Sequence, residues 1–73
     1  MGRAAVIGQE LRIQGFTLAG AVTFAAEDQD EARAAWRSLP PDIAVVILTP
    51  DAAAWLGEQL RQRRDVLPVV MRG

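Results

Sequence analysis

The sequence contains no cysteine and no histidine, and all eight of its basic residues are arginine. Without cysteine there is no disulfide, no thiolate nucleophile and no cysteine-based metal site. Without histidine the chain lacks the commonest metal ligand and the usual acid-base group near neutral pH. We therefore expect a protein that has no catalytic residues, no cofactor and no metal of its own.

The chain also has little net charge and no long apolar run. The formal net charge is −1, and only Arg61, Arg63 and Arg64 cluster, which is too little basic surface for nucleic-acid binding. No apolar run approaches the roughly 20 residues that span a bilayer, and the N-terminus has no signal-peptide pattern. These features predict a soluble intracellular protein that neither binds nucleic acid nor inserts into a membrane.

At 73 residues the chain is close to the lower size limit for an independent core. Apolar residues make up 51% of it, but many are alanines, which bury little surface. We expect one α/β domain over residues 1–73 that gains stability from a partner, or from self-association when it is isolated.

Strand and helix patterns alternate with short connections. Apolar runs predict strands at 4–7, 21–26, 43–48 and 67–71, and the segments between them predict helices at 10–19, 28–39 and 49–63. Connections this short require right-handed crossovers and a parallel sheet. The predicted fold is a four-stranded parallel sheet in the order 2-1-3-4, with flavodoxin-like topology.

Local signals support the second and third helices. Asp28 followed by Glu31 resembles a capping box, and Ala32, Ala35, Trp36 and Leu39 form one apolar stripe. Thr49-Pro50-Asp51 is a strong helix start. Gly57 is interpreted as a point of close approach to the sheet, and the run 43–48 as a strand covered on both faces.

The chemistry that doubly wound folds often carry is not evident. Gly8, Gly15 and Gly20 lack the G-x-G-x-x-G spacing of dinucleotide sites, and no phosphate-binding loop motif is present. A phospho-acceptor receiver domain would need an acidic cluster and a lysine; Glu10 and Asp51 supply carboxylates, but the chain has no lysine. The simpler role for Asp51 is to complement the dipole of its helix.

Two features point to contact with another protein. Leu11 and Leu18 fall nearly opposite the apolar face of the first helix, and with Gln14 they form a candidate interface. Alternatively, the helix ends before Leu18 and the following loop covers that leucine. Trp55 lies at the margin of its helix's stripe, where it is either an interface anchor or a tryptophan covered by its neighbours.

The opening of the chain carries a family resemblance. The strand ending Val6-Ile7-Gly8, followed by a helix with Gly15-Phe16-Thr17-Leu18-Ala19-Gly20, resembles the F subunit of V-type and A-type rotary ATPases. Glu27-Asp28, the strand 43–48 before Thr49, and Leu67-Pro68-Val69-Val70 extend the similarity over the chain. Gln9 departs from it, because many relatives have an acidic residue after the glycine.

The resemblance implies a non-catalytic subunit of the central rotor stalk, peripheral to the membrane on its cytoplasmic side. Such a subunit binds the coiled-coil stalk subunit and helps to couple ATP turnover to proton or sodium transport. The family's C-terminal helical segment is absent from the chain, so its contacts with the catalytic head are not implied here. A degenerate receiver-like module and a small-ligand sensor using the crevice near Gly8 and Thr49 are the alternatives.

Overall fold

We describe a computed structural model of the chain over residues 2–72, with every side chain of that range except those of residues 17–19. The elements follow in this order: β1 (Arg3–Gly8), α1 (Glu10–Ile13), the 3₁₀ helix η1 (Gln14–Ala19), β2 (Val22–Ala25), α2 (Gln29–Arg37), β3 (Ile43–Leu48), α3 (Pro50–Leu56), α4 (Gln59–Gln62) and β4 (Leu67–Val70). All four predicted strands are present, and their ends differ from the predicted ones by at most one residue.

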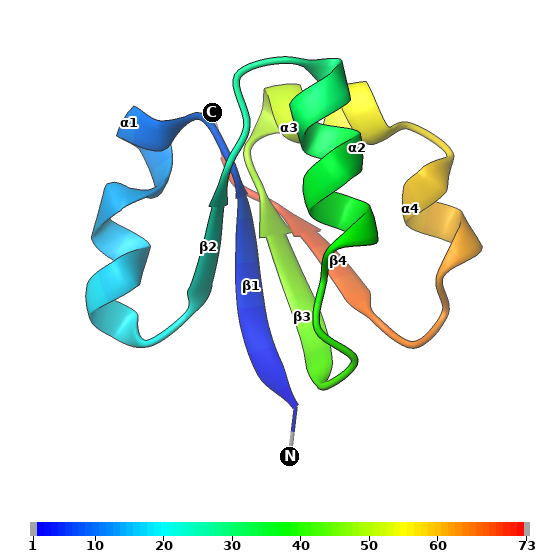
Figure 1. Cartoon of the computed structure of the whole chain (residues 1–73), viewed down its shortest axis with the longest axis horizontal. Coiled ribbons are helices and arrows are strands. Elements are labelled where there is room, and N and C mark those ends of the chain that lie inside the picture. Colours follow the sequence, from blue (N-terminus) through cyan, green and yellow to red (C-terminus); the bar gives the residue numbers. More distant parts are fainter. Residues whose placement is uncertain (1, 73) are drawn as a thin grey trace.

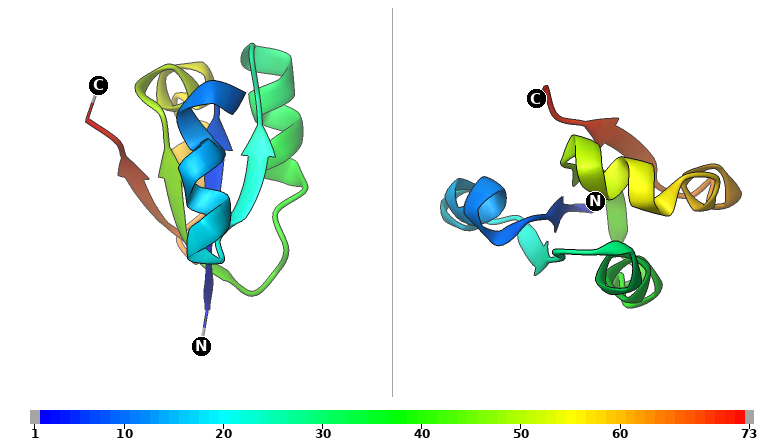
Figure 2. Two further views of the ribbon diagram at one scale, coloured as in Figure 1. Left: turned by 90° about the vertical axis from the view of Figure 1, so that its left-hand side faces the viewer. Right: turned by 90° about the horizontal axis from the view of Figure 1, so that it is seen from above.

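The four strands form one parallel sheet in the order β2-β1-β3-β4, which confirms the predicted α/β fold and strand order. Figure 1 shows α1 and η1 on one side of the sheet and α2 and α3 on the other. The end-on view in Figure 2 shows the same division into layers. One face is therefore covered by two helices in contact with each other, and within the described residues the opposite face is covered only by the α1–η1 segment.

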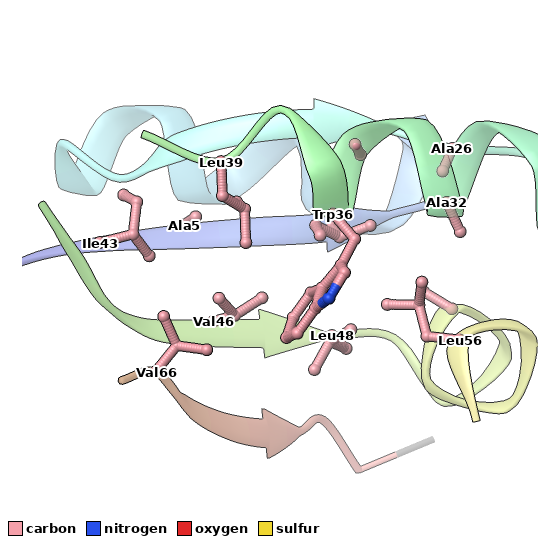
Figure 3. Close-up of a cluster of buried hydrophobic side chains, with 13 residues drawn as sticks. Ala5, Ala26, Ala32, Trp36, Leu39, Ile43, Val46, Leu48, Leu56 and Val66 are labelled. Atoms are coloured by element: carbon pink, nitrogen blue, oxygen red, sulfur yellow. The ribbon is translucent and has the colours of Figure 1, made fainter. Parts of the chain in front are cut away.

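The main core lies between the sheet and the pair α2 and α3. The predicted stripe of α2 is confirmed, since its four apolar residues are all buried. In Figure 3 the Trp36 indole points from α2 toward Val46 and Leu48 of β3. Ala5 and Ile7 of β1 extend this core beneath α2, so the middle strands contribute their apolar side chains to one continuous cluster.

Helices α2 and α3 begin where their sequence signals predict. The Asp28 carboxylate accepts a hydrogen bond from the Glu31 backbone N–H, and the Thr49 hydroxyl accepts one from Ala52 N–H. Each bond satisfies a backbone donor that has no partner within the first turn of its helix. The Glu31 carboxylate in turn accepts from Glu27 N–H, one residue before the cap. In a standard capping box the Glu31 side chain would accept from the N–H of the cap residue Asp28; here it accepts from the N–H of the residue before it.

The predicted continuous helix 49–63 is wrong. Helix α3 ends at Leu56, and α4 starts at Gln59 after a break at Gly57, whose φ is +53° and ψ −123°. A Cβ at Gly57 would meet nothing closer than 3.8 Å, so this glycine does not mediate a close approach to the sheet. Its role is conformational, because it turns the chain through a region that side chains disfavour.

The predicted first helix is also too long as an α-helix. Regular α-structure stops at Ile13, and the segment Gln14–Ala19 continues as a 3₁₀ helix. Gly15 lies within that segment and is a poor helix former. Gly20, with φ +82°, then turns the chain toward β2.

We predict that Gly57→Ala lowers the free energy of unfolding by about 1–3 kcal/mol, because alanine at this positive φ is strained. Urea denaturation measures the change. Gly15→Ala is the matched control: a Cβ there meets nothing within 4 Å and alanine is the better helix former, so we expect no loss of stability and a gain of at most about 1 kcal/mol. Equal stability of the two variants would contradict the conformational role.

Arg3 of β1 and Asp42, just before β3, form a two-pronged ion pair in which Arg3 Nη2 lies 3.0 Å from Asp42 Oδ1. Hydrogen bonding from Arg3 lowers the pKa of the Asp42 carboxyl below its usual range. The pair therefore contributes stability above the unfolded carboxyl pKa of about 3.9 and loses it as the pH falls further.

We expect Asp42→Asn to have a lower urea midpoint than the parent chain at pH 7, by a small amount because the pair is half exposed. The gap between the two chains should close as the pH is lowered from about 4 toward 2. A gap that stays constant over that range would show that the charge of Asp42 contributes nothing.

Candidate protein-binding surface

The carboxyl ends of β1 and β3 meet at the crevice where doubly wound folds usually bind ligands. Here Gly8 lies against the side chain of Thr49, which is only 1% exposed. The Thr49 hydroxyl donates to Gln9 Oε1 at 2.7 Å, and Gln9 Nε2 donates to Asp51 Oδ2 at 2.6 Å. The side chains of the chain itself therefore fill this crevice and satisfy one another's hydrogen bonds.

Three other carboxylates at this end of the sheet accept hydrogen bonds from backbone N–H groups at or next to helix starts. Glu27 Oε2 accepts from the backbone N–H of Glu10 at 2.8 Å, which caps α1, while Asp28 and Glu31 cap α2 as described. No group of three or more cysteine, aspartate or glutamate side chains within residues 2–72 is arranged to hold a metal ion. These carboxylates have a structural explanation in the start of the helices that they cap.

Gln9 is the residue that sequence reasoning marked only as a departure from the family pattern. Its carboxamide suits the crevice because it accepts from a hydroxyl and donates to a carboxylate at the same time. A glutamate could do only the first of these. Gln9 thus joins the end of β1 to the start of α3, a contact between residues 42 positions apart in the sequence.

We predict that Gln9→Glu destabilises the fold by about 1–3 kcal/mol at pH 7, because it places a second carboxylate against Asp51 and removes a donor. Repulsion raises the folded-state pKa of the introduced carboxyl above its unfolded value. The deficit should therefore be small near pH 4 and grow as the pH rises toward 7. Thermal melts across that range measure it, and a deficit independent of pH would contradict the charge contact.

The structure separates the predicted interface residues. Leu11 is 85% exposed and Gln14 is exposed, on the side of the sheet that carries α1. The Leu18 side chain lies outside the described part of the structure. Trp55 is half-buried against the main core beside α2, where Gln29 Nε2 donates to its carbonyl oxygen at 3.1 Å. Leu11 and Trp55 therefore lie over opposite faces of the sheet and do not form one surface.

The structure adds an apolar area that the sequence analysis missed. On the face that carries α1, Val45 and Ile47 of β3 lie in register with Leu67 and Val69 of β4. We call these four residues the uncovered strip. Leu67 is 61% exposed and Val69 43% exposed, and the two β3 residues are partly exposed. The prediction that the strand 43–48 is covered on both faces is therefore wrong for this face.

The physical reason is the position of α1. It contacts β1 and β2, where Val6 is fully buried, and no other helix within residues 2–72 lies over β3 and β4 on this face. Figure 2 shows this open side next to β4. As a consequence burial alternates along the second half of β3: Val46 and Leu48 are buried, whereas Val45 and Ile47 are partly exposed.

The three clustered arginines do not act as one patch. Arg63 Nη2 lies 2.6 Å from Asp65 Oδ2, and its guanidinium sits 5.9 Å from the centroid of the Trp36 ring. Hydrogen bonding from Arg63 lowers the pKa of Asp65. Arg61 and Arg64 are exposed. Arg63 therefore contacts residues of its own chain, and only Arg61 and Arg64 of the three present their side chains to solvent as exposed residues.

Fold and site together define a small doubly wound α/β domain whose usual ligand crevice is filled by its own side chains and whose sheet keeps an exposed apolar strip. The sequence model of one family, described as the ATP synthase (F/14-kDa) subunit, matches residues 4–72, and the chain belongs to this family. No curated protein matches the chain at a significant level.

Family membership makes the chain a subunit of a rotary ATP synthase complex of the V/A type, and it confirms the resemblance seen in the sequence. Within residues 2–72, none of the helices has both the length and the apolar character that crossing a bilayer would require.

Proposed function

We propose that the chain is a non-catalytic subunit of the central rotor stalk and that it binds the coiled-coil stalk subunit. The family supports a place in the rotary complex. The observation that carries the finer proposal is the uncovered strip, because an apolar surface of this kind on a small protein marks a contact with another chain. Through this contact the subunit takes part in coupling ATP turnover to proton or sodium transport, on the cytoplasmic side of the membrane.

The dimensions of the strip suit one helix. Neighbouring strands lie about 4.8 Å apart, so two strands present a band about 10 Å wide, similar to the diameter of a helix with its side chains. The α1–η1 segment already occupies the band over β1 and β2. A helix of the coiled coil would lie beside it and complete the cover of this face.

Residues on α1 and η1 extend the proposed interface. Leu11 and Gln14 are exposed on the same side of the sheet as the strip, and Leu18 follows them in η1. Leu11 has so little cover that it is available to a partner without any rearrangement. We assign Trp55, on the opposite side, to a separate and smaller contact, since part of its surface already packs on the core.

We predict that Val69→Glu weakens binding to the coiled-coil subunit at least about tenfold, because a carboxylate would be buried without a partner in the interface. Val70→Glu is the matched control. It lies on the same strand and is 50% exposed, but its side chain points to the opposite face, as that of its in-register neighbour Leu48 does. Co-purification of the two subunits, followed by titration of the purified chains, measures both variants.

Leu11→Glu should also weaken the complex while leaving the melting temperature within a few degrees of the parent chain. Circular dichroism verifies the fold of each variant. Failure of the parent chain to form a complex at micromolar concentration would overturn the proposal. Equal losses for Val69→Glu and Val70→Glu would show that the strip is not the interface.

A further inference from the structure

A groove lies at the other edge of the sheet, between β2 and α2, with a volume of about 480 Å³. Phe24 and Ala25 of β2 line one wall, and Ala34 and Ala35 of α2 line the other. Glu31, in the first turn of α2, and Ser38, at the C-cap of α2, also line the groove. Neither the closed crevice nor the uncovered strip includes any of these residues.

The edge of the groove offers free backbone groups. Ala26 N–H donates to Gly8 O at 2.9 Å, so the backbone groups of alternate residues of β2, at positions 22, 24 and 26, turn toward β1. Thr23 and Ala25 therefore turn their N–H and C=O groups outward. Because β2 is an edge strand, these are the groups with which an added strand would pair.

The opposite edge of the sheet differs. Met71 N–H donates to Leu48 O at 2.8 Å, which directs the backbone groups of Pro68 and Val70 away from the sheet. Proline has no N–H, so the outer side of β4 lacks one of the two donors that an added strand needs. Strand addition is thus disfavoured at β4 relative to β2.

The two ends of the groove carry opposite charges. The first turn of α2 carries Asp30 and Glu31, and its last turn carries Arg37 next to Ser38. An extended segment lying in the groove would therefore meet a carboxylate at the carboxyl end of β2. A cationic side chain at that end of the segment would complement it.

We propose that the edge of β2 and the groove beside α2 bind an extended segment of a partner protein, which adds to the sheet as an antiparallel fifth strand. Small apolar side chains at alternate positions of the segment enter the groove, and a lysine or arginine at its N-terminal end lies beside Glu31. Antiparallel pairing is favoured because it is the more stable ladder per residue. This is binding by strand addition, in which backbone bonds supply affinity and alternate side chains supply specificity.

Charge argues for a different partner rather than a second copy. The segment of residues 20–26, which a second copy would offer to this edge, contains no charged residue. It therefore has no cation to place beside Glu31. The proposed contact is also separate from the uncovered strip, which lies over β3 and β4 on the opposite face.

The test uses the 73-residue chain and the peptide acetyl-Lys-Thr-Val-Thr-Val-amide, with NMR to follow backbone amides. We expect binding at peptide concentrations below about 1 mM, with slowed hydrogen exchange at Thr23 and Ala25. A peptide N-methylated at the amides that pair with β2 should bind at least about tenfold more weakly, because two hydrogen bonds are lost. Replacing its lysine by glutamate should also weaken binding.

Protein variants locate the site. Ala34→Leu fills the groove and should weaken peptide binding at least about tenfold. Arg33→Leu, its exposed neighbour outside the groove lining, should not, and both variants should keep the coiled-coil contact of the uncovered strip.

Three results would overturn the proposal. The first is no binding of the peptide at about 1 mM, and the second is equal binding of the N-methylated peptide. The third is concentration-dependent protection of Thr23 and Ala25 without peptide, which would identify a second copy as the occupant of this edge.

Discussion

Each connection in a parallel sheet must cross over one of its faces, and the right-handed sense of the crossover decides which face. With the order β2-β1-β3-β4, the step from β1 to β2 runs in one direction and the next two steps run in the other. One connection therefore lies on one face and the helices of two connections lie on the other. This constraint places the main core beneath α2 and α3 and, within residues 2–72, leaves the β3–β4 half of the α1 face without a helix. The uncovered strip is a result of this topology.

The two edge strands differ in the backbone donors that they present to solvent. Pro68 removes a donor from the outer side of β4 at no cost to the ladder, because proline stands at a position that faces away from β3. In β2 the outward positions are Thr23 and Ala25, which keep their donors. The β4 edge is thus protected against unwanted pairing, while the β2 edge can accept a strand. The groove beside α2 would select that strand by its side chains.

Filling of the ligand crevice separates this domain from the nucleotide- and phosphate-binding members of the same architecture. Gln9 connects Thr49 and Asp51, and the carboxylates nearby cap helices. The polar groups at the carboxyl ends of the strands are then used to fix α1, α2 and α3 in place. Such a domain presents well-positioned surfaces, which suits the proposed contact with another subunit of the rotary complex.

The sequence by itself determined the strands, their parallel order, the caps of α2 and α3 and the buried stripe of α2, because periodicity and capping are local properties. It did not determine that Gly57 ends a helix, since a glycine beside an apolar stripe is compatible with either close packing or a turn. The sequence also did not determine that one face of β3 is uncovered, because a continuous apolar run is compatible with a strand covered on one face or on both. Only the tertiary structure decided which strands α1 covers, which backbone groups remain free at β2, and that Gln9 meets Asp51. These are relations between residues far apart in the chain, and they depend on the direction of the crossovers.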